Sequence, residues 1–279
     1  MTLLRIGALP DTLVAPVLVV AFDGWVDAAG ASSAAAEHLA EGGVPVVTFD
    51  DDRLFDYRSR RPTLDIIDGT LHRLQWPSLK IHHRAIGGRD LLILHGPEPD
   101  FRWQELGDAV GEFCLRAGVV EWISLGAIPA AVPHTRPVPV LATASRDGLL
   151  HEAEAKGPQG LLRVPSAALS SIELPVTELG VPAVGFYAQV PHYVGGPYAA
   201  ASVSLLRHLS RHLGIELPMD ELEQEQEAQR LRLDAAVAAD EDVQEILQRL
   251  EQNTEEELPS GDELAAEIER FLRGQADQS

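Results

Sequence analysis

The stretch VVAFDGWVDAAGASSAAAEHL, residues 19–39, has the pattern of a buried strand that runs directly into a helix. An uninterrupted apolar run over residues 16–21 is typical of a strand that is covered on both faces. Small residues over 28–40 favour a helix that lies close to a sheet, and glycines at 42 and 43 end it. A strand, a tight turn and a helix in this order predict an α/β fold.

The turn between these two elements carries Asp23, Trp25 and Asp27. Neither the glycine-rich dinucleotide fingerprint nor the P-loop pattern is present, and two carboxylates beside a helix N-terminus would repel a phosphate. We expect Asp27 to cap a helix that begins at Ala28, and Gly24 to permit the tight turn. Because Trp25 is an unusual residue for a simple connector, a functional role at this edge of the sheet remains open.

Further apolar runs and helical patterns alternate through the first 217 residues. Buried strands are predicted over 44–49, 90–95, 120–125, 138–144 and 183–190, and helices over 103–117, 167–178 and 198–213. This alternation predicts a three-layer α/β/α domain with a mostly parallel sheet. Residues 51–89 interrupt it and are typical of a polar loop with a hairpin or edge strands around Asp68 and Gly69.

Charge is distributed unevenly along the chain. The formal net charge is −21, and residues 218–279 contribute −14 of it, with 19 acidic and five basic side chains. We therefore predict an α/β core domain over residues 1–217 and an acidic, all-helical extension over 218–279. Within the extension, apolar faces over 243–250 and 264–272 predict two amphipathic helices, the second preceded by a capping box of Ser260 and Glu263.

The composition excludes several classes of protein. Nucleic-acid binding needs clustered Lys and Arg, which so acidic a chain lacks. No window approaches ~18 uninterrupted apolar residues, and the first residues do not resemble a secretory signal. Cys114 is the single cysteine, so neither a disulfide framework nor a cysteine-rich zinc site can form. We expect a cytoplasmic protein with no membrane span.

A second polar segment, GAIPAAVPHTRPVPV at residues 126–140, joins two predicted strands and carries His134, Thr135 and Arg136. Carboxyl ends of parallel strands share one edge of a sheet, so this loop is expected on the same edge as the first turn. His134 and Arg136 could hold an anion there or pair with Asp23, and a structural ion pair is an equally good interpretation.

A third segment follows the last predicted strand of the core. QVPHYVGGPYAA, residues 189–200, carries His192, Tyr193 and Tyr198. Its Gly-Gly-Pro at 195–197 could form an anion-binding nest, although proline at the start of a helix is also a common structural choice. Three loops at one edge predict a cleft without naming a reaction.

Motifs for known chemistry are missing from these loops. No Gly-x-Ser-x-Gly nucleophile elbow is present. His208 and His212 are spaced i, i+4 on one helical face but lack a third ligand, and the run Asp50–Asp52 after a strand is better interpreted as a solvated strand end than as a metal site. We therefore expect neither a metal nor a cofactor.

The phrases FDGWVDAAG (22–30), PHTRPVPV (133–140) and QVPHYVGGPYAA (189–200) together resemble the proteasome assembly chaperone two family, in particular its actinobacterial branch with a helical C-terminal extension. The resemblance implies an α/β/α domain reminiscent of nucleoside phosphorylases, assembled as homo-oligomers such as trimers, with protein partners. Some relatives dock through a C-terminal tail with a penultimate tyrosine, whereas this chain ends in RGQADQS. Others are labelled ATP-grasp ligases, a role that two lysines outside any glycine-rich loop disfavour.

The leading hypothesis is a non-enzymatic protein-interaction or assembly-chaperone-like protein. The alternative is an enzyme of nucleoside-phosphorylase-like or hydrolase type that uses the same cleft. Such an enzyme would need general acid–base catalysis by Asp23 or His134 and anion binding by Arg136.

Overall fold

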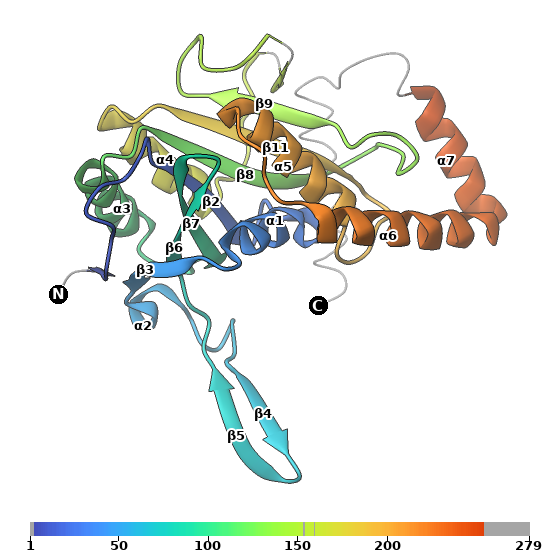
Figure 1. The fold of residues 1–279 in the computed structure, drawn as a ribbon. Helices are drawn as coiled ribbons and strands as arrows, with labels where there is room; N and C mark the ends of the chain where they lie inside the picture. The colour runs from blue at the N-terminus through green and yellow to red at the C-terminus, as the bar shows by residue number, and fades with distance from the viewer. Residues whose placement is uncertain (1–2, 153, 159, 254–279) are drawn as a thin grey trace.

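The computed structural model describes residues 3–152, 154–158 and 160–253 of the 279-residue chain. Its centre is a nine-stranded sheet with the strand order β1-β3-β6-β7-β2-β8-β11-β9-β10 (Figure 1). The strands are β1 (Leu4–Ile6), β2 (Val17–Asp23), β3 (Val44–Phe49), β6 (Lys80–Ile86), β7 (Arg89–Pro97), β8 (Glu121–Ala130), β9 (Val140–Ala144), β10 (Ala155–Lys156) and β11 (Ala183–Pro191).

The sheet is mixed, because parallel pairing is confined to its middle and one edge. The pairs β2–β7, β2–β8, β8–β11 and β9–β10 are parallel, whereas β1–β3, β3–β6, β6–β7 and β9–β11 are antiparallel. The expectation of a mostly parallel sheet was therefore too strong. Strand β6, inside the stretch that interrupts the alternation, joins β7 through a tight turn at Gly87 and Gly88 and so must run antiparallel to it.

Helices cover both faces of the sheet, which confirms the three-layer α/β/α class. One face packs against α1 (Ala31–Ala40) and α5 (Ala199–Leu213), and the other against α3 (Trp103–Ala117) and α4 (Ala168–Glu178). A short α2 (Asp51–Leu54) follows β3. Strand β2 is buried from Val17 to Phe22, since side chains on its two faces enter different hydrophobic cores. This explains why its sequence is apolar throughout instead of alternating.

A two-stranded hairpin, β4 (Thr63–Ile67) and β5 (Thr70–Gln75), projects from the body of the molecule (Figure 1). Its turn residues Asp68 and Gly69 have φ values of 49° and 78°. Two consecutive positive φ angles match the type I′ turn that suits the right-handed twist of a hairpin. The predicted hairpin is thus present, but it forms a separate sheet outside the core.

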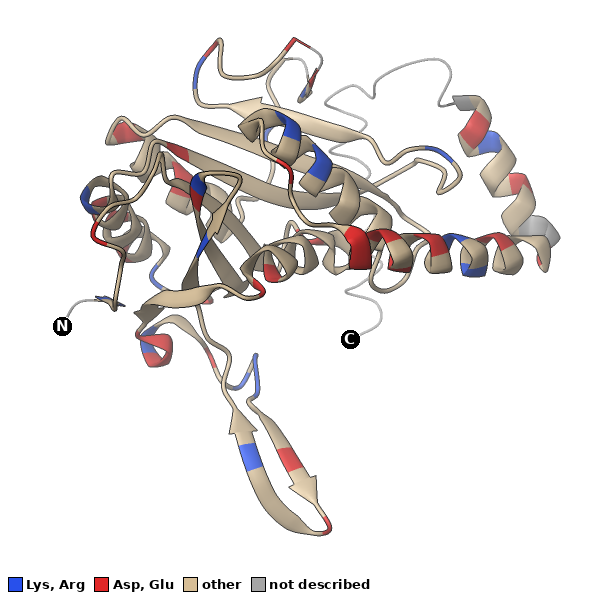
Figure 2. Cartoon of the chain, in the orientation of Figure 1, with Lys and Arg blue, Asp and Glu red and all other residues tan. Residues whose placement is uncertain are grey.

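The predicted acidic extension, residues 218–279, contains α6 (Asp220–Ala238) and α7 (Glu241–Asn253) in its described part. Helix α6 lies against α5, and Leu222 and Leu233 pack on the core cluster of that face. Figure 2 shows acidic residues, in red, along α6. The second predicted amphipathic helix, with its capping box at Ser260, lies outside the described residues. Within the described part of the chain, no helix is long and apolar enough to cross a membrane.

Candidate functional site

The backbones of the three polar segments meet at one edge of the sheet. Strands β2, β8 and β11 are adjacent and parallel, so their carboxyl ends lie together. The amide of Ala127 donates to the carbonyl of Val26 at 2.7 Å, and the amide of His192 donates to the carbonyl of Ala130 at 3.1 Å. The amide of Tyr198 in turn donates to the carbonyl of Ala29 at 3.1 Å. The side chains of these segments, however, point into different surroundings.

Asp27 uses its carboxylate to cap α1. Its Oδ1 accepts hydrogen bonds from the Ser32 amide at 2.7 Å, the Ser32 hydroxyl at 2.6 Å and the Ser33 amide at 3.1 Å, and its Oδ2 accepts from the Ser33 hydroxyl. Only 8% of Asp27 is exposed. The α-helix therefore begins at Ala31, not at Ala28 as expected, because residues 28–30 form one 3₁₀ turn. Asp27 is therefore a structural cap of α1.

Asp23 and Trp25 have partners outside the three polar segments. A carboxylate oxygen of Asp23 is 3.6 Å from a guanidinium nitrogen of Arg60, so Asp23 does not pair with His134 or Arg136. The Trp25 amide donates to Oε2 of Glu98 at 3.0 Å, while Oε1 of Glu98 accepts from the Ala168 amide at 2.7 Å. Glu98 thus ties the turn to the start of α4.

His134 forms the centre of a buried polar cluster. Its amide donates to the Tyr193 hydroxyl at 2.7 Å, so that hydroxyl is free to donate to the imidazole Nδ1, 2.8 Å away. The proton of a neutral ring then lies on Nε2, which is 3.3 Å from Oδ1 of Asp234 in α6. The carboxylate beside His134 therefore comes from the extension instead of from the first turn.

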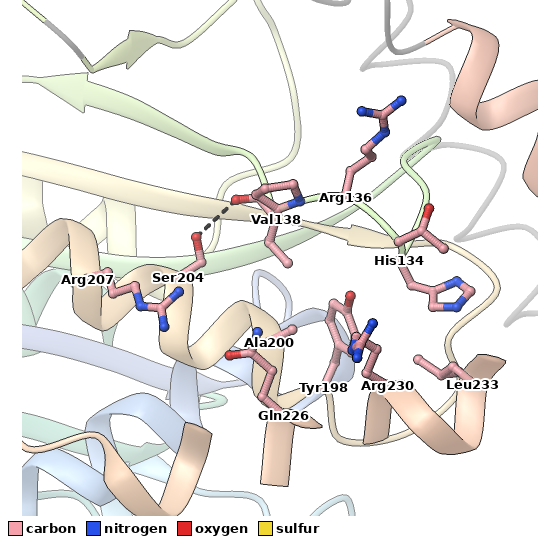
Figure 3. Close-up of a pocket in the computed structure, with 12 residues that line it drawn as sticks. His134, Arg136, Val138, Tyr198, Ala200, Ser204, Arg207, Gln226, Arg230 and Leu233 are labelled. Carbon is pink, nitrogen blue, oxygen red and sulfur yellow. Dashed lines mark hydrogen bonds between the residues drawn. The ribbon is translucent and has the colours of Figure 1, made fainter. Parts of the chain in front are cut away.

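A cavity of about 290 Å³ lies between the 134–138 segment, α5 and α6 (Figure 3). Four of the ten predicted site residues line it, namely His134, Thr135, Arg136 and Tyr198. The other six are not among its lining residues: Asp23, Gly24, Trp25, Asp27, His192 and Tyr193. The remaining lining residues are Pro137, Val138, Ala200, Ser204, Arg207, Gln226, Arg230 and Leu233. Of these, Ser204 donates its hydroxyl hydrogen to the Val138 carbonyl at 3.0 Å.

Acidic partners offset part of the positive charge around this cavity. Arg207 pairs with Glu223 at 2.8 Å, and Arg230 pairs with Glu227 at 2.9 Å. In Figure 3 the guanidinium of Arg136 points away from the side chains of Tyr198 and Arg230. Burial raises the pKa of Tyr198 to about 12, so its phenol stays protonated at neutral pH. The cavity can hold a small polar molecule through neutral donors and partly compensated guanidiniums.

The start of α5, next to the possible anion nest at residues 195–197, is bound from within the chain by Gln229. The amide of Ala199, the first residue of α5, donates to Oε1 of Gln229 at 2.9 Å, and the Gln229 amide group donates to the Pro197 carbonyl at 2.6 Å. His192 is turned to the Ala130 carbonyl, with its Nδ1 at 3.3 Å. These contacts leave the third segment held by α6 and by the end of the neighbouring strand β8.

Sequence reasoning missed the residues of the extension that complete this region. Gln229 and Asp234 of α6 and Glu251 of α7 bind the predicted loops, the last by accepting a hydrogen bond from the Thr135 hydroxyl at 2.5 Å. In the sequence they are ordinary members of charged helices, and nothing distinguishes them from neighbours that face solvent. Their role depends on where α6 and α7 dock.

Comparison with known proteins places this architecture in one family. The PAC2 family profile matches residues 21–237. A Mycobacterium tuberculosis proteasome-assembly chaperone homologue is 33% identical, with a TM-score of 0.75 over 83% of this chain and 99% of that chain. A Mycobacterium tuberculosis protein of unknown function is 29% identical, with a TM-score of 0.89 over 97% of this chain and 96% of that chain.

A more distant structure shares only the fold. An archaeal proteasome activator from Pyrococcus furiosus is 15% identical, with a TM-score of 0.63 over 85% of this chain and 99% of that chain. No match is found among curated proteins. The family profile covers well over half of the sequence, and the resemblance drawn from the three loop phrases is confirmed. The chain belongs to the PAC2 family.

Proposed function

We propose that this chain is a cytoplasmic, non-enzymatic protein that works as a homo-oligomer and contacts protein partners in the manner of an assembly chaperone. Membership of the PAC2 family supports the proposal, as does the likeness to a proteasome-assembly chaperone homologue. The acidic helices, with net charge −14 over residues 218–279, would provide a contact surface for partners with basic surfaces.

The projecting β4–β5 hairpin is the observation that carries this proposal. The large apolar side chains of the hairpin are exposed to solvent. Exposed fractions of 44–70% are found for Leu64, Ile66, Ile67, Leu71, Leu74 and the adjoining Trp76. A two-stranded hairpin alone is marginally stable in water, and contiguous exposed apolar surface marks an interaction site. The hairpin therefore has the composition of an element that becomes buried in a complex.

The occupant we propose for the hairpin surface is a second copy of this chain. Two copies with a net charge of −21 each repel one another over most of their surfaces. The hairpin is an exception, because residues 63–75 contain two acidic side chains, Asp65 and Asp68, against one arginine, Arg73 (Figure 2). Copies can approach there with little electrostatic cost and bury apolar surface, and a trimer would bury three hairpins.

Light scattering on the purified chain tests self-association. The wild-type mass is expected to be a multiple of the 30.2 kDa chain mass. Replacing Ile66 and Leu71 together with serine should return the mass to that of one chain. Leu174→Ser is the matched control, since Leu174 is 64% exposed on α4, and it should leave the mass unchanged. A monomeric wild type, or a hairpin variant that still assembles, would refute the role of the hairpin.

Partner capture tests the interaction role separately. The tagged full chain is isolated from its own cells, and the proteins that copurify are compared between wild type and the Leu174→Ser control. A reproducible set that dissociates as salt is raised would support contact through the acidic helices. Recovery of no stoichiometric protein partner, with the oligomer intact, would overturn the interaction role while leaving self-association in place.

The cavity supports a second candidate, an enzyme of nucleoside-phosphorylase-like or hydrolase type. Tyr198, Ser204 and Arg230 supply polar groups around a space large enough for a small substrate. The separation of Asp23 from this cavity removes one of the two expected acid–base groups and leaves His134. Incubation with purine nucleosides and phosphate, followed by chromatography, tests it: release of free base that His134→Gln abolishes would favour the enzyme.

A further inference from the structure

Three metal-ligating side chains from distant parts of the chain converge where α6 begins. His38 lies in the last turn of α1, Glu41 is the residue that ends that helix, and Glu221 lies in the first turn of α6. One ligand atom from each of the three lies within 4.8 Å of the others. Ligand atoms this close together could hold one metal ion.

A hydrogen bond outside this cluster prepares His38 to act as a ligand. Its Nε2 is 2.9 Å from the carbonyl oxygen of Pro218. A carbonyl only accepts hydrogen bonds, so Nε2 carries the ring proton and Nδ1 of the neutral ring presents a lone pair. Nδ1 is the nitrogen that faces Glu41, 3.7 Å from Oε2. Histidines that bind metals are commonly oriented in this way, by donating the other N–H to a carbonyl.

The charge around these residues favours a bound cation. Among the described residues, neither Glu41 nor Glu221 forms an ion pair with an arginine or lysine. The arginines nearby have other partners: Arg84 donates to the Leu39 carbonyl at 3.2 Å, and Arg207 pairs with Glu223 at 2.8 Å. Two carboxylates and an imidazole lone pair thus face one another, and a metal ion between them would convert mutual repulsion into attraction.

We propose that His38, Glu41 and Glu221 bind a divalent first-row transition-metal ion that fastens the start of α6 to the end of α1. An imidazole nitrogen selects zinc and its neighbours over calcium and magnesium, which prefer oxygen ligands alone. Three protein ligands leave at least one coordination position for water. The ion does no chemistry in this proposal; its role is to hold the helix whose later residues Gln226, Arg230 and Leu233 line the cavity.

No metal-binding motif in the sequence predicts this site, so no metal ion was expected here. His38 and Glu41 are three residues apart, but Glu221 follows 180 residues after Glu41. The proposal is independent of the proposed function, because it concerns how α6 is held and requires no partner protein.

Calorimetric titration of the full chain with Zn²⁺, after removal of metal by EDTA and dialysis, tests the site. Saturation at one ion per chain is expected. His38→Gln, which keeps a side-chain donor for Pro218, and Glu221→Gln, at an exposed position, should each weaken binding at least about tenfold. The matched controls are His72→Gln on the exposed hairpin and Glu112→Gln on the exposed face of α3, and both should bind as wild type does.

Two further measurements separate this site from weak surface binding. Co²⁺ should give visible absorption bands that His38→Gln abolishes, and Ca²⁺ should not compete with Zn²⁺. Hydrogen exchange in the first turns of α6 should slow on adding Zn²⁺ to wild type and not to Glu221→Gln. The proposal is overturned if Zn²⁺ does not saturate, if both variants bind as wild type does, or if Ca²⁺ displaces Zn²⁺.

Discussion

Nε2 of His134 lies 3.3 Å from Oδ1 of Asp234, which follows it by 100 residues and belongs to α6. The side chain of His134 is almost fully buried, with 1% exposed, whereas 43% of the Asp234 side chain is exposed. This contact joins the loop after β8 to the acidic extension, at the wall of the cavity.

Replacing Asp234 with alanine is expected to loosen α6 locally. The variant leaves the ring N–H of His134 without its partner, but solvent around Asp234 limits the loss of global stability to under about 1 kcal/mol. Hydrogen exchange should therefore accelerate in α6 while the urea midpoint barely moves. Asp220→Ala, at an exposed position of the same helix, is the control. Equal protection of α6 in both variants would contradict the contact.

Tyr193→Phe should cost more than Asp234→Ala. The Tyr193 hydroxyl accepts from the His134 amide and donates to its ring, so its removal leaves two buried polar groups of one residue unpaired. We expect a loss of about 1–3 kcal/mol in the free energy of unfolding, measured by urea denaturation. A variant as stable as wild type would mean that this cluster does not order the loop.

Asp27→Ala removes the cap of α1. Because one carboxylate oxygen satisfies two backbone amides, of Ser32 and Ser33, in a largely buried place, we expect a loss of about 2 kcal/mol in urea denaturation. Asp11→Ala, in an exposed loop, should be nearly neutral. If the two variants have the same midpoint, the capping role is wrong.

Because of His95, we expect the fold to lose stability in mild acid. Burial, followed by the charges of His82 and Lys80, lowers the pKa of His95 from 6.5 to about 4, and its Nε2 lies 2.8 Å from Nδ1 of His82. The unfolded chain therefore binds a proton more tightly than the folded chain does. Stability from this group is complete above pH 6.5 and is lost as the pH falls toward 4, by about 2 kcal/mol after allowance for partial exposure.

The comparison of wild type with His95→Gln isolates this effect from other titrating groups. The difference in unfolding free energy between the two should be constant above pH 6.5 and shrink between pH 6.5 and 4. His72→Gln, on the exposed hairpin, should run parallel to wild type throughout. A difference that does not vary with pH would show that His95 titrates normally.

The sequence by itself determined most elements of the core and their class. The apolar runs that predicted β3 and β11 match Val44–Phe49 and Ala183–Pro191 closely, and the predicted helix over 103–117 is α3. These strands and helices could be predicted because their signals are local. A continuous apolar run indicates a strand buried on both faces, and a glycine directly after a helix marks where the helix ends. The family resemblance carried by the three loop phrases belongs to the same local level.

Only the tertiary structure decided which side chains meet. Asp23 and Asp27 are four residues apart, yet one pairs with Arg60 and the other caps α1. His134 meets Asp234, and His38 meets Glu221, across separations that no periodicity in the sequence encodes. The strand order, the docking of α6 and the exposed hairpin follow from packing of the whole chain, whose energy sums many weak contacts between distant residues. Local patterns therefore place each residue on an element, and only packing supplies its partner.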